Sequence, residues 1–147
     1  MVVGNGDHVE PLAEALSAGT PASDAWSVQT FEPDSPIFTP RIWVAWELTH
    51  GRPLLGCARR SARPGGAADQ VLWLADVTHP GSGLLMTTYQ GTAGQVTTSR
   101  EFLDVVVKEH AVAQLLELVW QELDPELRVA ALVLELQDGK ATRLLRT

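Results

Sequence analysis

The stretch FEPDSPIFTPRIWVAWEL, residues Phe31 to Leu48, changes character at Arg41. Its first ten residues contain three prolines, which rule out a helix and favour an extended, rigid segment. From Arg41 onward β-branched, aromatic and aliphatic residues dominate, which is typical of a β-strand. We therefore expect a proline-braced segment that leads directly into a strand over residues 41–48.

Further strands are expected on both sides of this stretch. Residues 1–3 are predicted to end a strand, and the turn Gly4-Asn5-Gly6-Asp7 follows, in which glycine permits positive φ. The other predicted strands span residues 54–61, 70–77, 84–90, 102–108 and 129–136, and a hairpin turn at Asp138-Gly139 returns the chain through 141–146. Residues 62–69 and 91–99 are predicted to be loops. Short turns between consecutive strands indicate a largely antiparallel sheet.

Helices are predicted to pack on this sheet. Apolar residues at helical spacing indicate one helix from Val9 to Leu16, for which Asp7 and Glu10 resemble a capping box. A short helix within residues 20–29 is expected to have Ser23 or Asp24 as its cap. The fold class that follows is α+β.

The clearest helical pattern covers residues 109–123. Its apolar stripe consists of Val112, Leu115, Leu116, Val119 and Leu123. The tryptophans are predicted to belong mostly to the core, and they are Trp26, Trp43, Trp46, Trp73 and Trp120. A chain of 147 residues has room for one domain, which we expect over residues 1–147.

Composition narrows the possible functions. The formal net charge of -7 argues against nucleic-acid binding, which depends on basic residues, although a small anionic substrate remains possible. No apolar stretch is long enough for a membrane span, and the N-terminus lacks a signal pattern. Cys57 is the single cysteine, so no intrachain disulfide can form, and a cytoplasmic location is expected.

Metal, thiol and cofactor chemistry are not indicated by the motifs. The histidines (His8, His50, His79 and His110) lack metal-ligand spacing and are interpreted as surface or loop residues. Cys57 lies within a predicted strand and is interpreted as a small core residue. No P-loop or dinucleotide fingerprint is present. We therefore expect neither a metal nor a cofactor.

Polar residues on predicted turns are the remaining candidates for a site. They are Asn5, Asp7, Glu32, Asp34, Arg41, Tyr89 and Arg100. Polar groups displayed from rigid loops often form binding sites. Structural roles are the alternative: Glu32 capping the proline-rich segment, Arg41 paired with Asp34, and Tyr89 half-buried on a strand.

Several motifs resemble, in order, those of the archaeal-type IMP cyclohydrolase family and its bacterial relatives. The stretch from Phe31 to Ile42 resembles the family motif FEPDxPxxTPRI. Asn5-Gly6 resembles its NG turn, residues 81–91 its G-x-G…TYxG strand and loop, and residues 120–129 its closing helix and strand. The resemblance covers essentially the whole chain. It implies part of an Ntn-hydrolase-like αββα sandwich that needs no metal.

The resemblance also implies roles for individual residues. The family closes a purine ring, as a carboxamide nitrogen attacks a formyl carbon on a ribotide and water leaves. Glu32 would accept from the amide, Tyr89 would donate to the departing oxygen, and Asn5 would hold the carboxamide. Arg41 would stabilise charge or phosphate, and Arg100 would be a further substrate-binding residue.

One family feature is absent from the sequence. Family members carry an N-terminal segment with a GRSxxSxxR-like motif, whereas here Met1-Val2-Val3 leads directly into the NG turn. We therefore expect a homo-oligomer or a partner subunit that supplies the missing part. Three functions stay open: a cyclohydrolase or related cyclodehydratase, a separately encoded subunit that a partner completes, and a binding module without catalysis.

Overall fold

The computed structural model describes residues 1–46, 52–76, 79–92, 95–98, 102–108, 111–138 and 140–147. Its contacts divide the chain into two compact units. Unit 1 comprises Met1–Val77 and Leu84–Asp104, and unit 2 comprises Thr78–Gly83 and Val105–Thr147. Helices and strands occur in both units, and the strand pairs β1–β2, β2–β3, β3–β4, β6–β7 and β9–β10 are antiparallel, so the predicted α+β class is confirmed.

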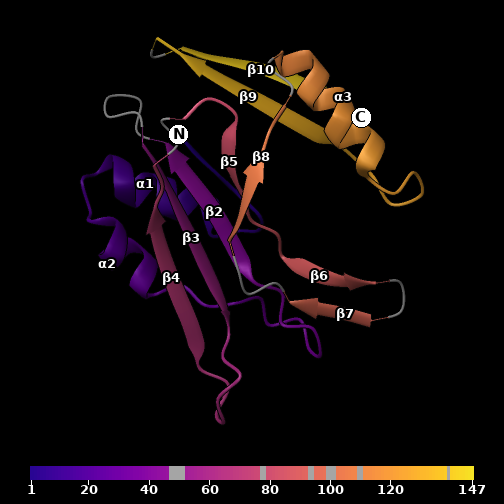
Figure 1. Cartoon of the computed structure of the whole chain (residues 1–147). Helices are drawn as coiled ribbons and strands as arrows, with labels where there is room; N and C mark the ends of the chain where they lie inside the picture. Colours follow the sequence, from indigo (N-terminus) through magenta and orange to yellow (C-terminus); the bar gives the residue numbers. More distant parts are fainter. Residues whose placement is uncertain (47–51, 77–78, 93–94, 99–101, 109–110, 139) are drawn as a thin grey trace. The chain divides into compact units, whose positions relative to one another are not determined.

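A four-stranded sheet forms the centre of unit 1 (Figure 1). Its strands lie in the order β1 (Val2–Gly4), β2 (Arg41–Trp46), β3 (Pro53–Arg60) and β4 (Ala68–Leu74). Each strand runs antiparallel to its neighbour. The predicted strands at 1–3, 41–48, 54–61 and 70–77 therefore exist, although residues 47, 48 and 77 of these predictions lie outside the described residues.

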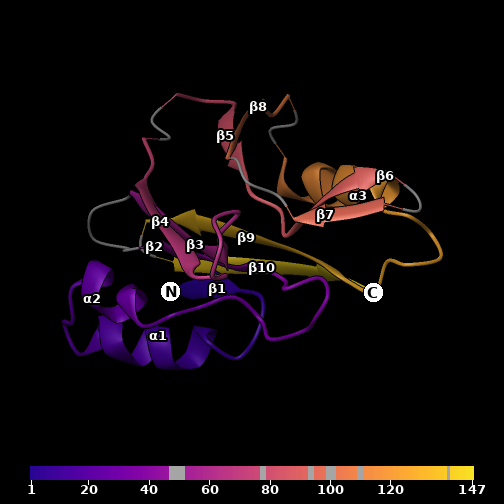
Figure 2. The same ribbon diagram turned by 90° about the horizontal axis from the view of Figure 1, so that it is seen from below.

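Two helices, α1 (Val9–Ser17) and α2 (Ala22–Ser27), cover one face of this sheet (Figure 2). Both predicted caps are wrong. The N-cap residues are His8 and Pro21, and neither makes a side-chain capping hydrogen bond. The Asp7 carboxylate is instead paired with Arg41.

The core of unit 1 lies between the helices and the sheet. It consists of Leu12, Trp26, Trp43 and Ala58. The two indoles meet edge to face with ring centroids 5.3 Å apart, a favoured geometry for aromatic pairs. Trp73 was expected in the core as well, but it is 47% exposed on β4.

The elements between β4 and the last helix differ from the sequence prediction. Residues 84–90 were expected to form one strand, but two separate strands occur there, β5 (Ser82–Leu85) and β6 (Tyr89–Thr92). The predicted loop at 91–99 is wrong for most of its described residues, because β6 pairs antiparallel with β7 (Gln95–Thr98). β5 pairs with β8 (Leu103–Val106). The glycines of this stretch led to the loop prediction, although its threonines and Val96 favour strands.

Unit 2 contains α3 (Val112–Glu122) and a hairpin of β9 (Ala131–Gln137) and β10 (Lys140–Arg146). The predicted apolar stripe of α3 is partly wrong, because Val119 is 41% and Leu123 is 38% exposed. Leu116 and Trp120 are the buried residues, and they pack with Ala131. Among the described residues, no helix combines the length and the apolar character that a membrane crossing needs.

Gly56 allows β3 to pack directly against the Trp43 side chain in the core of unit 1. It lies opposite Trp43 in the β2–β3 register, and a Cβ there would come within 2.2 Å of the indole. Because Trp43 is fully buried, the ring has no space into which it can move. The close contact therefore requires glycine.

We predict that Gly56→Ala lowers the free energy of unfolding by roughly 1–3 kcal/mol, the usual cost of overpacking. The measurement is urea unfolding followed by circular dichroism. Gly83→Ala serves as the control, since its added Cβ would approach only methyl groups of Val105 and Val107, at 3.3 and 3.8 Å. A Gly56→Ala midpoint equal to that of the unmodified protein would contradict the packing described.

Candidate functional site

Asn5 joins the turn after β1 to the start of β2. Its Nδ2 donates to the Pro40 carbonyl at 3.0 Å, and its Oδ1 accepts from the Ile42 N–H at 2.7 Å. Its own backbone N–H donates to the Ile42 carbonyl at 3.2 Å. Gly6 follows with φ of +94°, as the turn prediction required. Both functional atoms of the Asn5 amide are thus bound to backbone.

Arg41 is paired with two carboxylates. Its Nε donates to Glu32 Oε1 at 2.8 Å and its Nη2 to Glu32 Oε2 at 3.2 Å, which is a two-pronged contact. Nη2 also reaches Asp7 Oδ1 at 2.7 Å. The hydrogen bond to Glu32 is the main reason why the pKa of Arg41 is raised. The predicted alternative of an Arg41–Asp34 pair is therefore not what the structure has.

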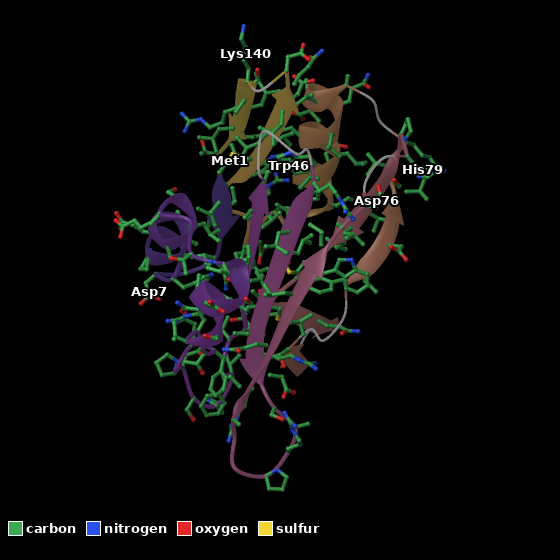
Figure 3. The ribbon with its side chains drawn as sticks, turned by 90° about the vertical axis from the view of Figure 1, so that its left-hand side faces the viewer. Met1, Asp7, Trp46, Asp76, His79 and Lys140 are labelled. Atoms are coloured by element: carbon green, nitrogen blue, oxygen red, sulfur yellow. The ribbon has the colours of Figure 1, made fainter. Side chains whose placement is uncertain are left out.

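The exposure of this trio decides where a ligand has access. The Arg41 side chain is 14% exposed, that of Glu32 is 26%, and that of Asp7 is 82%. Figure 3 shows Met1 and Trp46 at one end of the sheet and Asp7 toward the other. Glu32 is thus held by its partner yet remains within reach of solvent.

A second hydrogen-bonded group lies two residues before Arg41. The backbone N–H of Thr39 donates to Asp34 Oδ1 at 2.7 Å, and the Thr39 hydroxyl donates to Asp34 Oδ2. Thr39 Oγ1 lies 2.6 Å from the Tyr89 hydroxyl, at the first residue of β6. The Thr39 carbonyl accepts from the Glu32 N–H at 2.9 Å. Thr39 therefore connects Tyr89 to the backbone of Glu32.

His8 is a correction to the sequence interpretation. It was expected at the surface, but it is only 3% exposed and packs edge to face on Trp26, 5.6 Å between centroids. Among the residues that the structure describes, neither ring nitrogen has a hydrogen-bond partner. Burial, and after it the charge of Arg41, lowers the pKa of His8, so the imidazole is neutral at pH 7.

Within the described part of the chain, Asp7, His8 and Glu32 form a group that could hold a metal ion. Each offers one ligand atom, and these atoms all lie within 4.8 Å of one another. The donor set of two carboxylates and an imidazole suits several divalent metals. However, both carboxylates already bind Arg41, so a metal ion would have to compete with the guanidinium.

The candidates from the sequence are thus partly assembled. Glu32 and Arg41 are in direct contact, and Asn5 and Tyr89 reach the same Thr39–Ile42 segment. Arg100 lies outside the described residues.

Cys57 is half-buried on β3, and burial raises the pKa of its thiol, in agreement with a packing role. The sequence reasoning missed Thr39 and His8. The sequence did contain evidence for Thr39, because this residue lies in the motif from Phe31 to Ile42, directly before Pro40 and Arg41.

The Asp34–Thr39 contact predicts a defined pH dependence. The hydrogen bonds of Thr39, first from its hydroxyl and then from its backbone, lower the pKa of Asp34 below the ordinary 3.8. The unfolded chain therefore takes up this proton at a higher pH than the folded one. The stabilisation is complete above pH 3.8 and is lost as the pH falls through the lower folded pKa.

We expect the difference in unfolding free energy between the unmodified protein and Asp34→Asn to be constant near neutral pH. It should shrink as the pH falls below 3.8. Urea unfolding of both proteins across this pH range measures the difference. Taking the difference cancels the contributions of the other carboxyl groups, which both proteins share. A difference that does not change with pH would show that Asp34 is not bound as a carboxylate.

Comparison with known proteins identifies the family of this chain. A family model described as IMP cyclohydrolase-like protein matches residues 1–140. Searches of curated proteins and of solved structures gave no match. The matched range includes Asn5, Glu32, Thr39, Arg41 and Tyr89. The chain belongs to the IMP cyclohydrolase-like protein family.

Proposed function

We propose that the protein closes a ring on a formamido-carboxamide ribotide or a related small substrate, in a cyclohydrolase-type reaction. One observation carries the proposal. In a chain of this family, the Glu32 carboxylate is fixed by two hydrogen bonds from Arg41 and is still partly exposed. A carboxylate so oriented suits a reaction in which amide protons must be removed.

The reaction itself sets what the site must do. The carboxamide nitrogen forms a bond to the formyl carbon, and the C–O bond of the formyl group breaks. The oxygen leaves as water, with one proton from each of the two nitrogens. The chain must therefore provide a proton acceptor near the carboxamide and hydrogen bonds that hold the reacting atoms together.

Glu32 is the proposed proton acceptor. A carboxylate has two oxygens with about four lone-pair positions in all, and Arg41 uses one position on each oxygen. The remaining positions are available to an amide N–H. Arg41 acts in this proposal through Glu32, because its rigid fork fixes the plane of the carboxylate.

The phosphate of a ribotide is better bound away from this pair. Asp7, Glu32 and Arg41 together carry a net charge of -1, which does not attract an anion. Arg100 is the predicted substrate-binding residue that fits this task. Asn5 supports the site by holding the backbone at Pro40 and Ile42, and we propose this role for it in place of direct substrate contact.

A binding subunit of the same family is the second candidate. It is favoured by the apolar character of β4, an edge strand of the four-stranded sheet. Its residues Leu72, Trp73 and Leu74 are 37%, 47% and 54% exposed. Exposed apolar edge strands are common where another chain binds. In that case the protein would assemble with a second copy or a partner.

The test is single-turnover and steady-state assay of the formamido-carboxamide ribotide, following loss of substrate and formation of the closed ring. Glu32→Gln should reduce kcat by about a hundredfold to ten thousandfold, the range for loss of a general base. Glu14→Gln, at an exposed position of α1, is the matched control and should retain full activity. Addition of a chelator should leave the rate unchanged.

The outcomes separate the two candidates. Turnover that survives Glu32→Gln would contradict the proposed role of Glu32. Binding of the ribotide without turnover, at concentrations where sedimentation shows an assembled protein, would favour the binding subunit instead.

A further inference from the structure

The hydrogen bonds around Thr39 fix the direction in which Tyr89 points its proton. Thr39 Oγ1 contacts two oxygens, one from Asp34 and one from Tyr89. A threonine hydroxyl has a single proton, but it can accept through two lone pairs. If the Thr39 hydroxyl donates to Asp34, Tyr89 must donate to Thr39. If it donates to Tyr89, Tyr89 is the acceptor.

Asp34 is the neighbour that receives it. The pKa of Asp34 is lowered, so its carboxylate is ionised at neutral pH and can only accept. The Thr39 proton is therefore directed at Asp34 Oδ2, and Thr39 Oγ1 is left as an acceptor. The Tyr89 O–H is the donor that fills it, across the 2.6 Å contact.

We propose that Tyr89 presents an oxygen lone pair to the ligand, as an acceptor, because the Asp34–Thr39 pair binds its proton. This reverses the donor role that the family resemblance implied for Tyr89. Thr39 is then a positioning residue, which acts on the ligand through Tyr89. Tyr89 as a residue is 43% exposed, and a phenol oxygen that donates its proton to Thr39 keeps its lone pairs for a ligand.

The ligand chemistry follows from the set of acceptors. Glu32 offers carboxylate lone pairs and Tyr89 offers a phenol lone pair, while the backbone N–H of Glu32 is already bound to Thr39. A ligand that contacts both of these acceptors must offer hydrogen-bond donors, as a primary carboxamide does and an ionised carboxylate of the same shape does not. The Tyr89 assignment depends on the hydrogen bonds of Thr39 and the ionised Asp34 carboxylate, and only the identity of the ribotide rests on the proposed function.

The direction of the Tyr89 hydrogen bond can be measured without any assay of activity. Tyr89 is the single tyrosine of the chain, so the tyrosine doublet in the ultraviolet resonance Raman spectrum reports this residue alone. The relative intensity of the doublet distinguishes a phenol that donates strongly from one that accepts. We expect the strong-donor pattern in the unmodified protein and in Thr39→Ser, and its loss in Thr39→Val.

Two Raman results would overturn the inference. One is an acceptor pattern in the unmodified protein, and the other is the same doublet in Thr39→Val as in Thr39→Ser. If Thr39→Val does not fold, the spectrum of the unmodified protein still decides the direction of the bond.

Binding measurements test the ligand class. The probes are 5-aminoimidazole-4-carboxamide ribotide and its 4-carboxylate counterpart, titrated calorimetrically into the full chain. We expect the carboxamide to bind more tightly, and Thr39→Val to reduce this preference by about tenfold, or about 1.4 kcal/mol, while Thr39→Ser keeps it. An unchanged preference in Thr39→Val would overturn the acceptor role. Failure of both ribotides to bind, together with the expected Raman result, would refute the proposed substrate and leave the Tyr89 assignment in place.

Discussion

The hydrogen bonds between Asn5 and the start of β2 are the constraint on which the rest of unit 1 depends. They extend the β1–β2 pairing beyond Gly4 through a side chain, since the amide binds the backbone at Pro40 and Ile42. This fixes the register of β2, and alternate residues of a strand share a face. Arg41 and Trp43 therefore lie on the same face as each other.

That shared face links the core to the site. Trp43 packs against Trp26 and over Gly56, while Arg41, two residues earlier, meets Glu32 and Asp7. Thr39, two residues earlier again, binds Asp34 and Tyr89. A segment of five residues thus runs from the buried core to the polar groups. A rigid backbone of this kind holds polar groups in place before a ligand arrives, which reduces the entropy lost on binding.

The sequence predicted the elements whose evidence is local. The α+β class, the strands of the four-stranded sheet and the glycine turn at Gly6 all follow from residue patterns within short windows. The motif from Phe31 to Ile42 also placed Glu32 and Arg41 in one segment, and they are in contact. The shared environment of these two residues was therefore within reach of the sequence.

Other features depend on contacts between distant residues. Asp7 was expected to cap α1, but an ion pair with Arg41, 34 residues away, takes its carboxylate. The hydroxyl contact between Thr39 and Tyr89 spans 50 residues, and no periodicity reports it. His8 lies on a turn, and its burial against Trp26 comes from the packing of α2. The spacing of apolar residues in α3 likewise did not predict which of them are buried. Leu116 and Trp120 are buried together with Ala131 of β9, whereas Val119 is exposed.

The central claim is that the Asn5 side chain holds the segment that carries Thr39 and Arg41. Hydrogen exchange at the Ile42 amide tests it most directly, because that N–H donates to Asn5 Oδ1. The account predicts much faster exchange at Ile42 in Asn5→Ala and an intermediate rate in Asn5→Asp, which keeps the acceptor for the Ile42 N–H but loses the donor to the Pro40 carbonyl. Unchanged protection of Ile42 in Asn5→Ala would contradict the account, since the segment would then be held without the Asn5 side chain.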